Sequence, residues 1–358
     1  MVTFILFIVI FGVVVIAHEF GHFLIAKANG IHVVEFAVGM GPDLLSFKKG
    51  GTKYSLKLLP IGGACMFEGE DGLAAEDEGS EETKEPGPGS FLKAKVWSRI
   101  ATVVAGPFFN FILAFIVAFI MVSMIANSDP VAAQVQEGSG AYEAGLQDGD
   151  RIISLNGERV YLFQEISMFM QLTYRGGDID VVYERDGIRY STALTPQYSE
   201  ESGYYMLGIS NGDYVKASGF DSLKYAWYEM RFSVKSTYKS LGMLFSGRVS
   251  RKDVAGPVGI AVNVVGATYE ATKEYGWQNV FVNMLNITLA LSVNLGILNL
   301  LPIPALDGGR LVFLLAEVVR GKPVPPEKEG VVHFIGFVFF MILMVFIFFN
   351  DLVNIFIK

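Results

Sequence analysis

The sequence has few charged residues and almost no cysteine. Of its 358 residues, 18% are charged and 52% are hydrophobic, whereas ordinary soluble domains carry about 25% charged residues. Cys65 is the single cysteine, which excludes an intramolecular disulfide framework. The formal net charge of -8 argues against a nucleic-acid-binding protein, because such proteins carry a basic stripe. A plain soluble domain is also excluded, because the apolar residues are too many and too unevenly placed.

The hydrophobic residues gather in four long runs. A helix needs about 20 mostly apolar residues to cross a bilayer. The runs that satisfy this requirement are residues 2–26, 100–126, 277–306 and 331–356. No Lys or Arg precedes the first run and no small-residue cleavage site follows it, so we expect a permanent helix rather than a cleaved signal peptide. The sequence therefore predicts a polytopic α-helical membrane protein with four transmembrane helices.

Lysine and arginine counts predict which segments face the cytoplasm. Residues 27–99 contain nine, residues 307–330 contain four, and only Lys358 follows the last run. Residues 127–276 contain fourteen, but a stretch long enough to fold as a domain escapes the positive-inside rule. We therefore expect residues 27–99 and 307–330 in the cytoplasm, and both termini and the inserted domain outside it.

The segments between the runs differ in kind. Residues 31–67 alternate apolar and polar residues between Gly-rich turns, which indicates short strands and hairpins; the family resemblance described below implies that this β-hairpin region is membrane-associated. Nine of the eighteen residues from Glu68 to Glu85 are acidic, which predicts a solvated cytoplasmic loop over residues 68–90. We divide the chain into an N-terminal membrane core over 1–127, a β-rich domain over 128–212, an amphipathic segment over 213–276 and a C-terminal membrane core over 277–358.

The amphipathic segment has two interpretations. Residues 221–245 show helical periodicity, with apolar residues on one face and lysine and arginine on the remainder. This pattern suits a helix that lies on the membrane surface. A helix packed against the preceding β-rich domain explains the same pattern.

A metal-binding motif lies inside the first apolar run. His18, Glu19 and His22 form an H-E-x-x-H pattern on a predicted helix. Four residues make about one turn, so both imidazoles face the same side and can bind one metal ion, with the glutamate in reach of a water on that ion. Ionisable groups inside a spanning helix are costly and usually functional. The alternative is a pair of hydrogen-bonded interior histidines.

Asp307 is the candidate for a third ligand, because catalytic zinc usually takes three protein ligands. It follows Pro302 and Pro304, which forbid regular helix at the end of the third run. An ordinary helix end with an aspartate cap explains the same pattern. His18 lies about 24 Å along the first helix from Val2. With the expected topology, His18 and Asp307 then reach a similar depth toward the cytoplasmic side.

Together these motifs resemble the site-2 protease family of intramembrane zinc metalloproteases. The H-E-x-x-H pattern is followed far downstream by N-x-x-P-x-P-x-x-D-G over residues 299–308. Residues 105–110 resemble the G-P-x-x-N signature of the family's second core helix, and residues 256–261 resemble a G-P-x-G-I element. Residues 141–157 are similar to a PDZ domain. The resemblance covers almost the whole chain and is closest to the bacterial sigma-E regulator protease (RseP) branch, here with a single PDZ domain.

The resemblance implies a role for each motif residue. It implies that His18, His22 and Asp307 bind one catalytic Zn²⁺, and that Glu19 is the catalytic base. It implies that Asn299 holds the substrate backbone near the metal, although an interhelical hydrogen bond is the alternative for this residue. The family's β-hairpin is thought to pair with extended substrate. That pairing implies substrate-binding candidates at Tyr54, Leu56, Leu58, Gly62 and Gly63.

By this resemblance the protein hydrolyses peptide bonds within or near transmembrane segments of single-pass membrane proteins in the bacterial inner membrane. The implied partners are these substrates, the lipid bilayer, and peptides or proteins at an extracytoplasmic PDZ domain that filters substrate access. Two alternatives use the same ligands. A zinc transporter or sensor predicts further His or Asp residues along the helix bundle. A non-catalytic PDZ scaffold would tolerate loss of Glu19, which is present.

Overall fold

The computed structural model describes residues 2–69, 87–200, 203–212, 214–249 and 254–356. Most of the predicted acidic loop therefore lies outside the described residues. The chain divides into two compact units, Met1–Ala114 with Ser250–Lys358 and Phe115–Val249. Each unit contains hydrophobic clusters of its own. The inserted unit is wider than the predicted β-rich domain at both ends.

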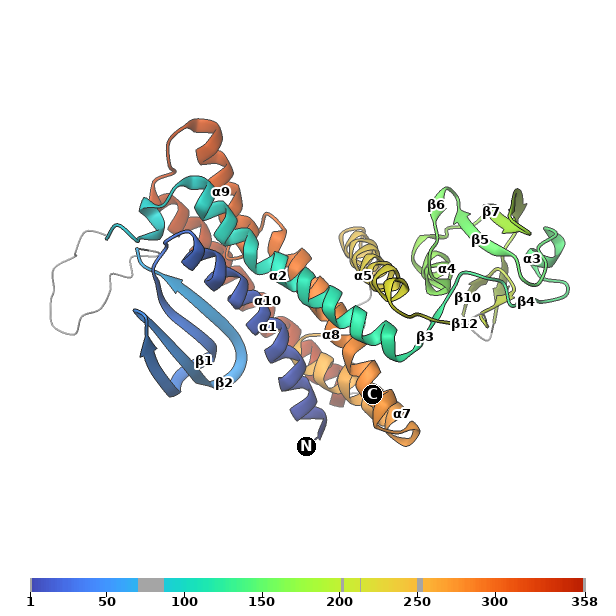
Figure 1. Cartoon of the computed structure of the whole chain (residues 1–358), viewed down its shortest axis with the longest axis horizontal. Coiled ribbons are helices and arrows are strands. Elements are labelled where there is room, and N and C mark those ends of the chain that lie inside the picture. Colours follow the sequence, from blue (N-terminus) through green and yellow to red (C-terminus); the bar gives the residue numbers. More distant parts are fainter. Residues whose placement is uncertain (1, 70–86, 201–202, 213, 250–253, 357–358) are drawn as a thin grey trace. The chain divides into compact units, whose positions relative to one another are not determined.

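Helices of membrane-spanning length dominate the first unit (Figure 1). Within the described residues, four helices are long and apolar enough to cross a bilayer, which confirms the predicted helical membrane protein. They are α1 (Val2–Ala28), α2 (Val96–Met124), α8 (Trp277–Leu300) and α10 (Pro326–Phe356). Their exposed side chains are largely apolar, as a surface facing lipid requires.

The third membrane helix is shorter than the predicted 277–306. α8 ends at Leu300, and residues 301–306 form turns, because two prolines fall within this stretch. Ala305 adopts a left-handed conformation with φ of 72°, and its backbone N–H donates to Nδ1 of His333 at 3.0 Å. The next helix is α9 (Asp307–Arg320). Asp307 therefore lies in the first turn of a separate helix and not at the end of the membrane helix.

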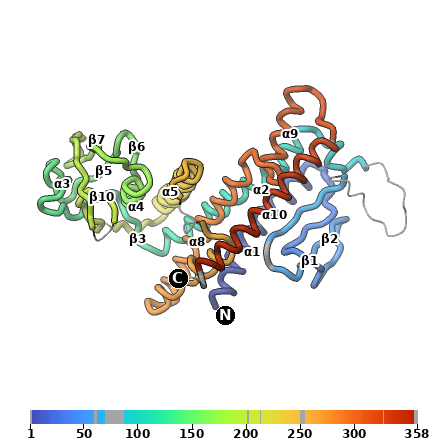
Figure 2. The backbone as a smooth tube through the Cα atoms, turned by 180° about the vertical axis from the view of Figure 1, so that it is seen from behind, coloured from blue at the N-terminus to red at the C-terminus, as the bar shows by residue number. Residues whose placement is uncertain are grey.

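Two long strands, β1 (Val33–Lys49) and β2 (Thr52–Phe67), lie beside α1 (Figure 2). The register shows that both strands bend and pair with each other more than once. Residues 53–56 have stretches of β1 on both sides, whereas residues 63–67 have β1 on one side only. Among the described strands, residues 63–66 therefore form a free edge of this sheet. A short 3-10 helix, η1 (Phe91–Lys93), follows before α2.

The G-P-x-G-I element opens a short helical segment that is held by α10. Its parts are α6 (Pro257–Gly259), η4 (Ile260–Gly266), α7 (Ala267–Thr272) and η5 (Lys273–Tyr275). The carboxylate of Asp351, 1% exposed, accepts hydrogen bonds from the backbone N–H of Gly256 at 2.9 Å and of Gly259 at 2.8 Å. A Cβ atom at either glycine would lie within 3.0 Å of Asp351 side-chain atoms. Both glycines therefore allow this carboxylate to reach the backbone.

The second unit contains a four-stranded antiparallel sheet in the order β6-β5-β7-β8. These strands are β5 (Arg151–Leu155), β6 (Glu158–Arg159), β7 (Ile179–Arg185) and β8 (Ile188–Leu194). Three short pairs accompany it: β3 (Ala126–Ser128) with β12 (Tyr214–Lys216), β4 (Gln134–Val135) with β11 (Ile209–Ser210), and β9 (Gln197–Ser199) with β10 (Tyr204–Met206). The short helices are α3 (Gly140–Glu143), α4 (Phe163–Met168) and the π-helical η2 (Phe169–Thr173). Ile152, Leu155, Ile179 and Leu194 from the sheet are fully buried.

Helix α5 (Phe220–Phe245) packs against this β-rich unit. Glu165 is fully buried, and its carboxylate accepts hydrogen bonds from Arg231 at 2.9 Å and Lys235 at 3.2 Å. The hydroxyl of Tyr225 donates to Asp129 at 2.5 Å. These contacts agree with the second interpretation of residues 221–245, a helix packed against the preceding β-rich domain.

Candidate metal centre

The two histidines of the H-E-x-x-H motif lie on one face of α1 and are buried, with exposed fractions of 8% and 7%. Nδ1 of His22 lies 2.8 Å from the backbone carbonyl oxygen of Thr102. A carbonyl oxygen only accepts, so Nδ1 carries the proton and Nε2 of a neutral His22 presents a lone pair. Fixing the other ring nitrogen in this way is how proteins orient a metal-binding histidine.

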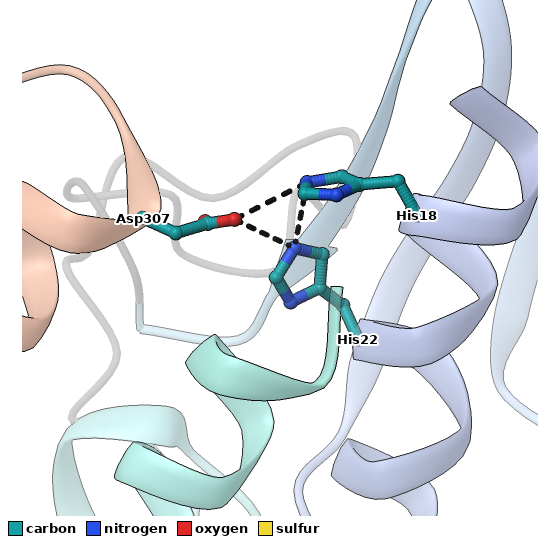
Figure 3. A group of neighbouring side chains, drawn as sticks. All are labelled: His18, His22 and Asp307. Carbon is teal, nitrogen blue, oxygen red and sulfur yellow. Dashed lines mark hydrogen bonds and ion pairs between the residues drawn. The ribbon is translucent and has the colours of Figure 1, made fainter. Parts of the chain in front are cut away.

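Asp307 brings the third donor atom to this pair (Figure 3). Its Oδ2 atom lies 3.2 Å from Nε2 of His18 and 3.4 Å from Nε2 of His22. The two Nε2 atoms are 3.2 Å apart. A tetrahedral ion with bonds of about 2.05 Å separates its ligand atoms by about 3.3 Å. All three observed distances match that value, so these residues fit a zinc ion with one position left open.

The Asp307 carboxylate supports the same conclusion. Among the residues that the structure describes, its buried Oδ2 atom accepts no hydrogen bond, which is costly for a carboxylate unless an ion satisfies it. In the part of the chain that the structure describes, this is the only group of three His, Cys, Asp or Glu side chains close enough to share one ion.

Glu19 follows His18 on α1 and lies against the edge of the β1–β2 sheet. The backbone N–H of Cys65 donates a hydrogen bond to its carboxylate. A Cβ atom at Gly63 would lie 2.8 Å from Cγ of Glu19 and 2.9 Å from Cγ1 of Val15. Only glycine therefore allows β2 to approach α1 this closely, and Glu19 lies alongside the free edge of the sheet.

Glycine also sets the distance between α1 and α2. A Cβ atom at Gly21 would lie 2.4 Å from the carbonyl oxygen of Ala105, and one at Gly106 would lie 2.2 Å from Nε2 of His22. Each helix thus contributes one glycine to the contact. This contact explains why a glycine lies in the H-E-x-x-H motif and another opens the G-P-x-x-N signature.

The remaining predicted substrate residues are spread over the sheet and α8. Tyr54 pairs with Phe36 and Phe47 on its two sides, and Leu56 is likewise paired on both sides. These two residues belong to the interior of the sheet and offer no free backbone edge, unlike the Gly63 stretch. The exposed side chain of Leu58 is apolar, and Gly62 has φ of 82° beside Met40. Asn299 is buried in the last turn of α8.

Two contacts to the histidines were not assigned a role from sequence. The side-chain amide of Asn110 lies 3.1 Å from Nδ1 of His18, and the Thr102 carbonyl binds His22. Asn110 is the last residue of the G-P-x-x-N signature, so the signature marked its position without its function. The Thr102 contact uses a main-chain atom, which no residue type reveals.

Comparisons with known proteins find relatives of this chain among the zinc metalloproteases. The profile of peptidase family M50 matches residues 6–343. The zinc metalloprotease RasP of Bacillus licheniformis is 33% identical over 426 residues, which covers 99% of each chain. RasP of Geobacillus kaustophilus is 33% identical over 97% of this chain and 96% of its own. The regulator of sigma-W protease RasP of Bacillus subtilis is 32% identical over 99% of each chain.

Proposed function

We propose, from the premise that this chain belongs to peptidase family M50 and is a zinc metalloprotease, that it cleaves membrane proteins within or near their transmembrane segments. His18, His22 and Asp307 hold the zinc ion in this proposal, and Glu19 is the general base. The observation that carries it is the set of three distances between the buried donor atoms, which fits a tetrahedral ion on a membrane-spanning helix. When bound, zinc supplies a Lewis acid that polarises the scissile carbonyl and makes water nucleophilic near neutral pH.

The side chain of Glu19 performs the proton transfers. It is one residue from His18 on α1, so its carboxylate reaches the same side of the site. It accepts the proton of the attacking water and passes it to the leaving amine. The N–H of Cys65 orients this carboxylate from the sheet edge.

The free edge of the β1–β2 sheet is proposed to bind the substrate segment once that segment has unwound. The carbonyl groups of a transmembrane helix are already hydrogen-bonded within the helix, so the segment must unwind before attack. Residues 63–66 have an unpaired side among the described strands and, apart from the Cys65 N–H that is bonded to Glu19, can accept the unwound segment by β-augmentation. Asn299 is proposed to hold the same backbone through its amide donor and acceptor. Tyr54 and Leu56 shape the sheet from its interior.

The membrane placement follows from the charge counts. We place the protein in the bacterial inner membrane with the zinc site toward the cytoplasm, and with both termini and the β-rich unit outside. The β-rich unit is proposed to be a single PDZ domain that filters substrates. The Bacillus subtilis relative is named a regulator of sigma-W, so an anti-sigma factor is one substrate candidate and a remnant signal peptide is another. The assignment to the sigma-E regulator branch stays a prediction.

The test is cleavage of a purified single-pass substrate by the purified protein in detergent. Glu19→Gln is expected to lose cleavage while retaining zinc, because the amide cannot accept the proton and the ligands are unchanged. His22→Ala is expected to lose zinc as well as cleavage. Equal cleavage by the wild type and Glu19→Gln would refute the general-base assignment, and an unchanged zinc content in His22→Ala would remove that residue from the site.

A further inference from the structure

Asn110 is a fully buried residue of α2 that contacts Nδ1 of His18, the ring nitrogen that does not face Asp307 and His22. Its amide Nδ2 atom lies 3.1 Å from Nδ1 of His18, and its buried Oδ1 atom has no hydrogen-bond partner in the described part of the chain. Its backbone carbonyl accepts a hydrogen bond from the buried hydroxyl of Ser292 on α8 at 2.8 Å. Contacts to α1 and α8 therefore hold the side-chain Nδ2 atom and the backbone carbonyl of Asn110, whereas its Oδ1 atom is not satisfied by the described residues.

Proton accounting shows which amide orientation suits a bound metal. A neutral imidazole carries one proton, so a His18 that binds an ion through Nε2 must carry its proton on Nδ1. That N–H requires an acceptor, and the Nδ2 group of an amide is only a donor. A half turn of the amide exchanges Oδ1 and Nδ2 and brings the unpartnered oxygen opposite Nδ1 of His18.

We infer that Asn110 is a positioning residue whose amide oxygen accepts the Nδ1–H of His18 and thereby selects the tautomer that presents Nε2 to the zinc ion. This inference rests on the zinc site proposed above. It completes a symmetrical arrangement, because His22 already donates its Nδ1–H to the Thr102 carbonyl at 2.8 Å. The two histidines then differ in one respect: the acceptor for His22 is backbone, whereas the acceptor for His18 is a side chain that a substitution can remove.

The experiment measures zinc affinity by competition with a chelator, using the purified full-length protein in detergent. Asn110→Leu and Asn110→Ala remove the acceptor, and zinc affinity is expected to fall about 10-fold to 100-fold, the usual effect of losing an outer-shell partner. Asn110→Asp retains an acceptor and no donor, so it is expected to bind zinc at least as tightly as the wild type. Thr288→Val, which removes a buried hydroxyl that bonds only within α8, is the matched control and is expected to leave zinc affinity unchanged.

Wild-type zinc affinity in both acceptor-free variants would overturn the inference. So would an Asn110→Asp variant that binds zinc as weakly as Asn110→Leu, because the amide N–H would then be the required group. Asp307→Ala separates this inference from the proposed site. If Asp307→Ala loses zinc and the acceptor-free variants do not, only the role of Asn110 fails; if Asp307→Ala retains zinc at wild-type affinity, the site itself fails.

Discussion

Gly106→Ala is predicted to remove zinc although the residue is no ligand. The added methyl group would lie 2.2 Å from Nε2 of His22. A Cβ atom essentially never lies within 3.0 Å of such a neighbour, so the imidazole and α2 must separate by at least about 0.8 Å, whereas zinc–ligand distances tolerate only about 0.2 Å. If α2 moves instead of the ring, the bond from His22 to the Thr102 carbonyl on the same helix lengthens from 2.8 Å.

The expected magnitude is therefore that of losing a ligand. Zinc affinity should fall by more than the roughly 100-fold that marks the upper end for an outer-shell change. Alanine is favoured over glycine inside a helix by about 1 kcal/mol, so the loss cannot be attributed to a weaker α2. Gly12→Ala in α1 is the matched control, because nothing lies within 4 Å of its added Cβ atom.

The assay is zinc content after dialysis against a graded chelator, with substrate cleavage measured on the same samples. Gly12→Ala should retain both properties, and Gly106→Ala should lose both while its far-ultraviolet circular dichroism stays helical. A Gly106→Ala protein with wild-type zinc affinity would refute the close approach of α2 to His22.

Two further predictions concern parts of the molecule away from the metal centre. Asp351→Ala leaves the backbone N–H groups of Gly256 and Gly259 without their acceptor, which costs about 1–3 kcal/mol for each group. The thermal unfolding midpoint of the protein should therefore fall, and it should fall less for Asp351→Asn. An unchanged midpoint in Asp351→Ala would contradict the contact. Burial raises the pKa of Glu229 from its ordinary 4.5 to about 7, against a partly compensating hydrogen bond from Gln164. As the pH rises, the Glu229 carboxyl ionises in the unfolded chain before it ionises in the folded protein, so the free energy of unfolding should fall between pH 4.5 and 7. Glu229→Gln should remove that fall and raise the thermal unfolding midpoint at about pH 8. The control variant Glu143→Gln, at an exposed residue, should change neither.

The sequence predicted the membrane helices well, because hydrophobic length is a direct physical requirement for crossing a bilayer. The end of the third helix was misplaced: apolar content continues through Leu306, and hydrophobicity alone does not register that the backbone leaves the helix at Leu301. The packing of α5 cannot be predicted from the sequence for a related reason. Its lysines and arginines look the same in sequence whether they face water or, as here, the buried carboxylate of Glu165.

The ligand residues could be proposed from sequence because their chemistry is carried by residue type. His18 and His22 share a face because four residues make about one helical turn. Asp307 is indicated by the two prolines that end the helix before it and by the family resemblance. Which part of the β-hairpin region forms the free edge of the sheet could not be predicted. Tyr54 and Gly63 lie on the same strand, and only the bending of β1 and β2 decides that one is interior and the other is at the edge.

The most direct test of the account is X-ray absorption at the zinc edge on the purified protein. We predict two imidazole nitrogens at about 2.0–2.1 Å and carboxylate oxygen at about 2.0–2.2 Å, with the imidazole signal reduced in His18→Ala and no bound zinc at wild-type affinity in Asp307→Ala. A sulfur ligand at about 2.3 Å would have to come from Cys65, and that result would contradict a site built from two histidines and one aspartate.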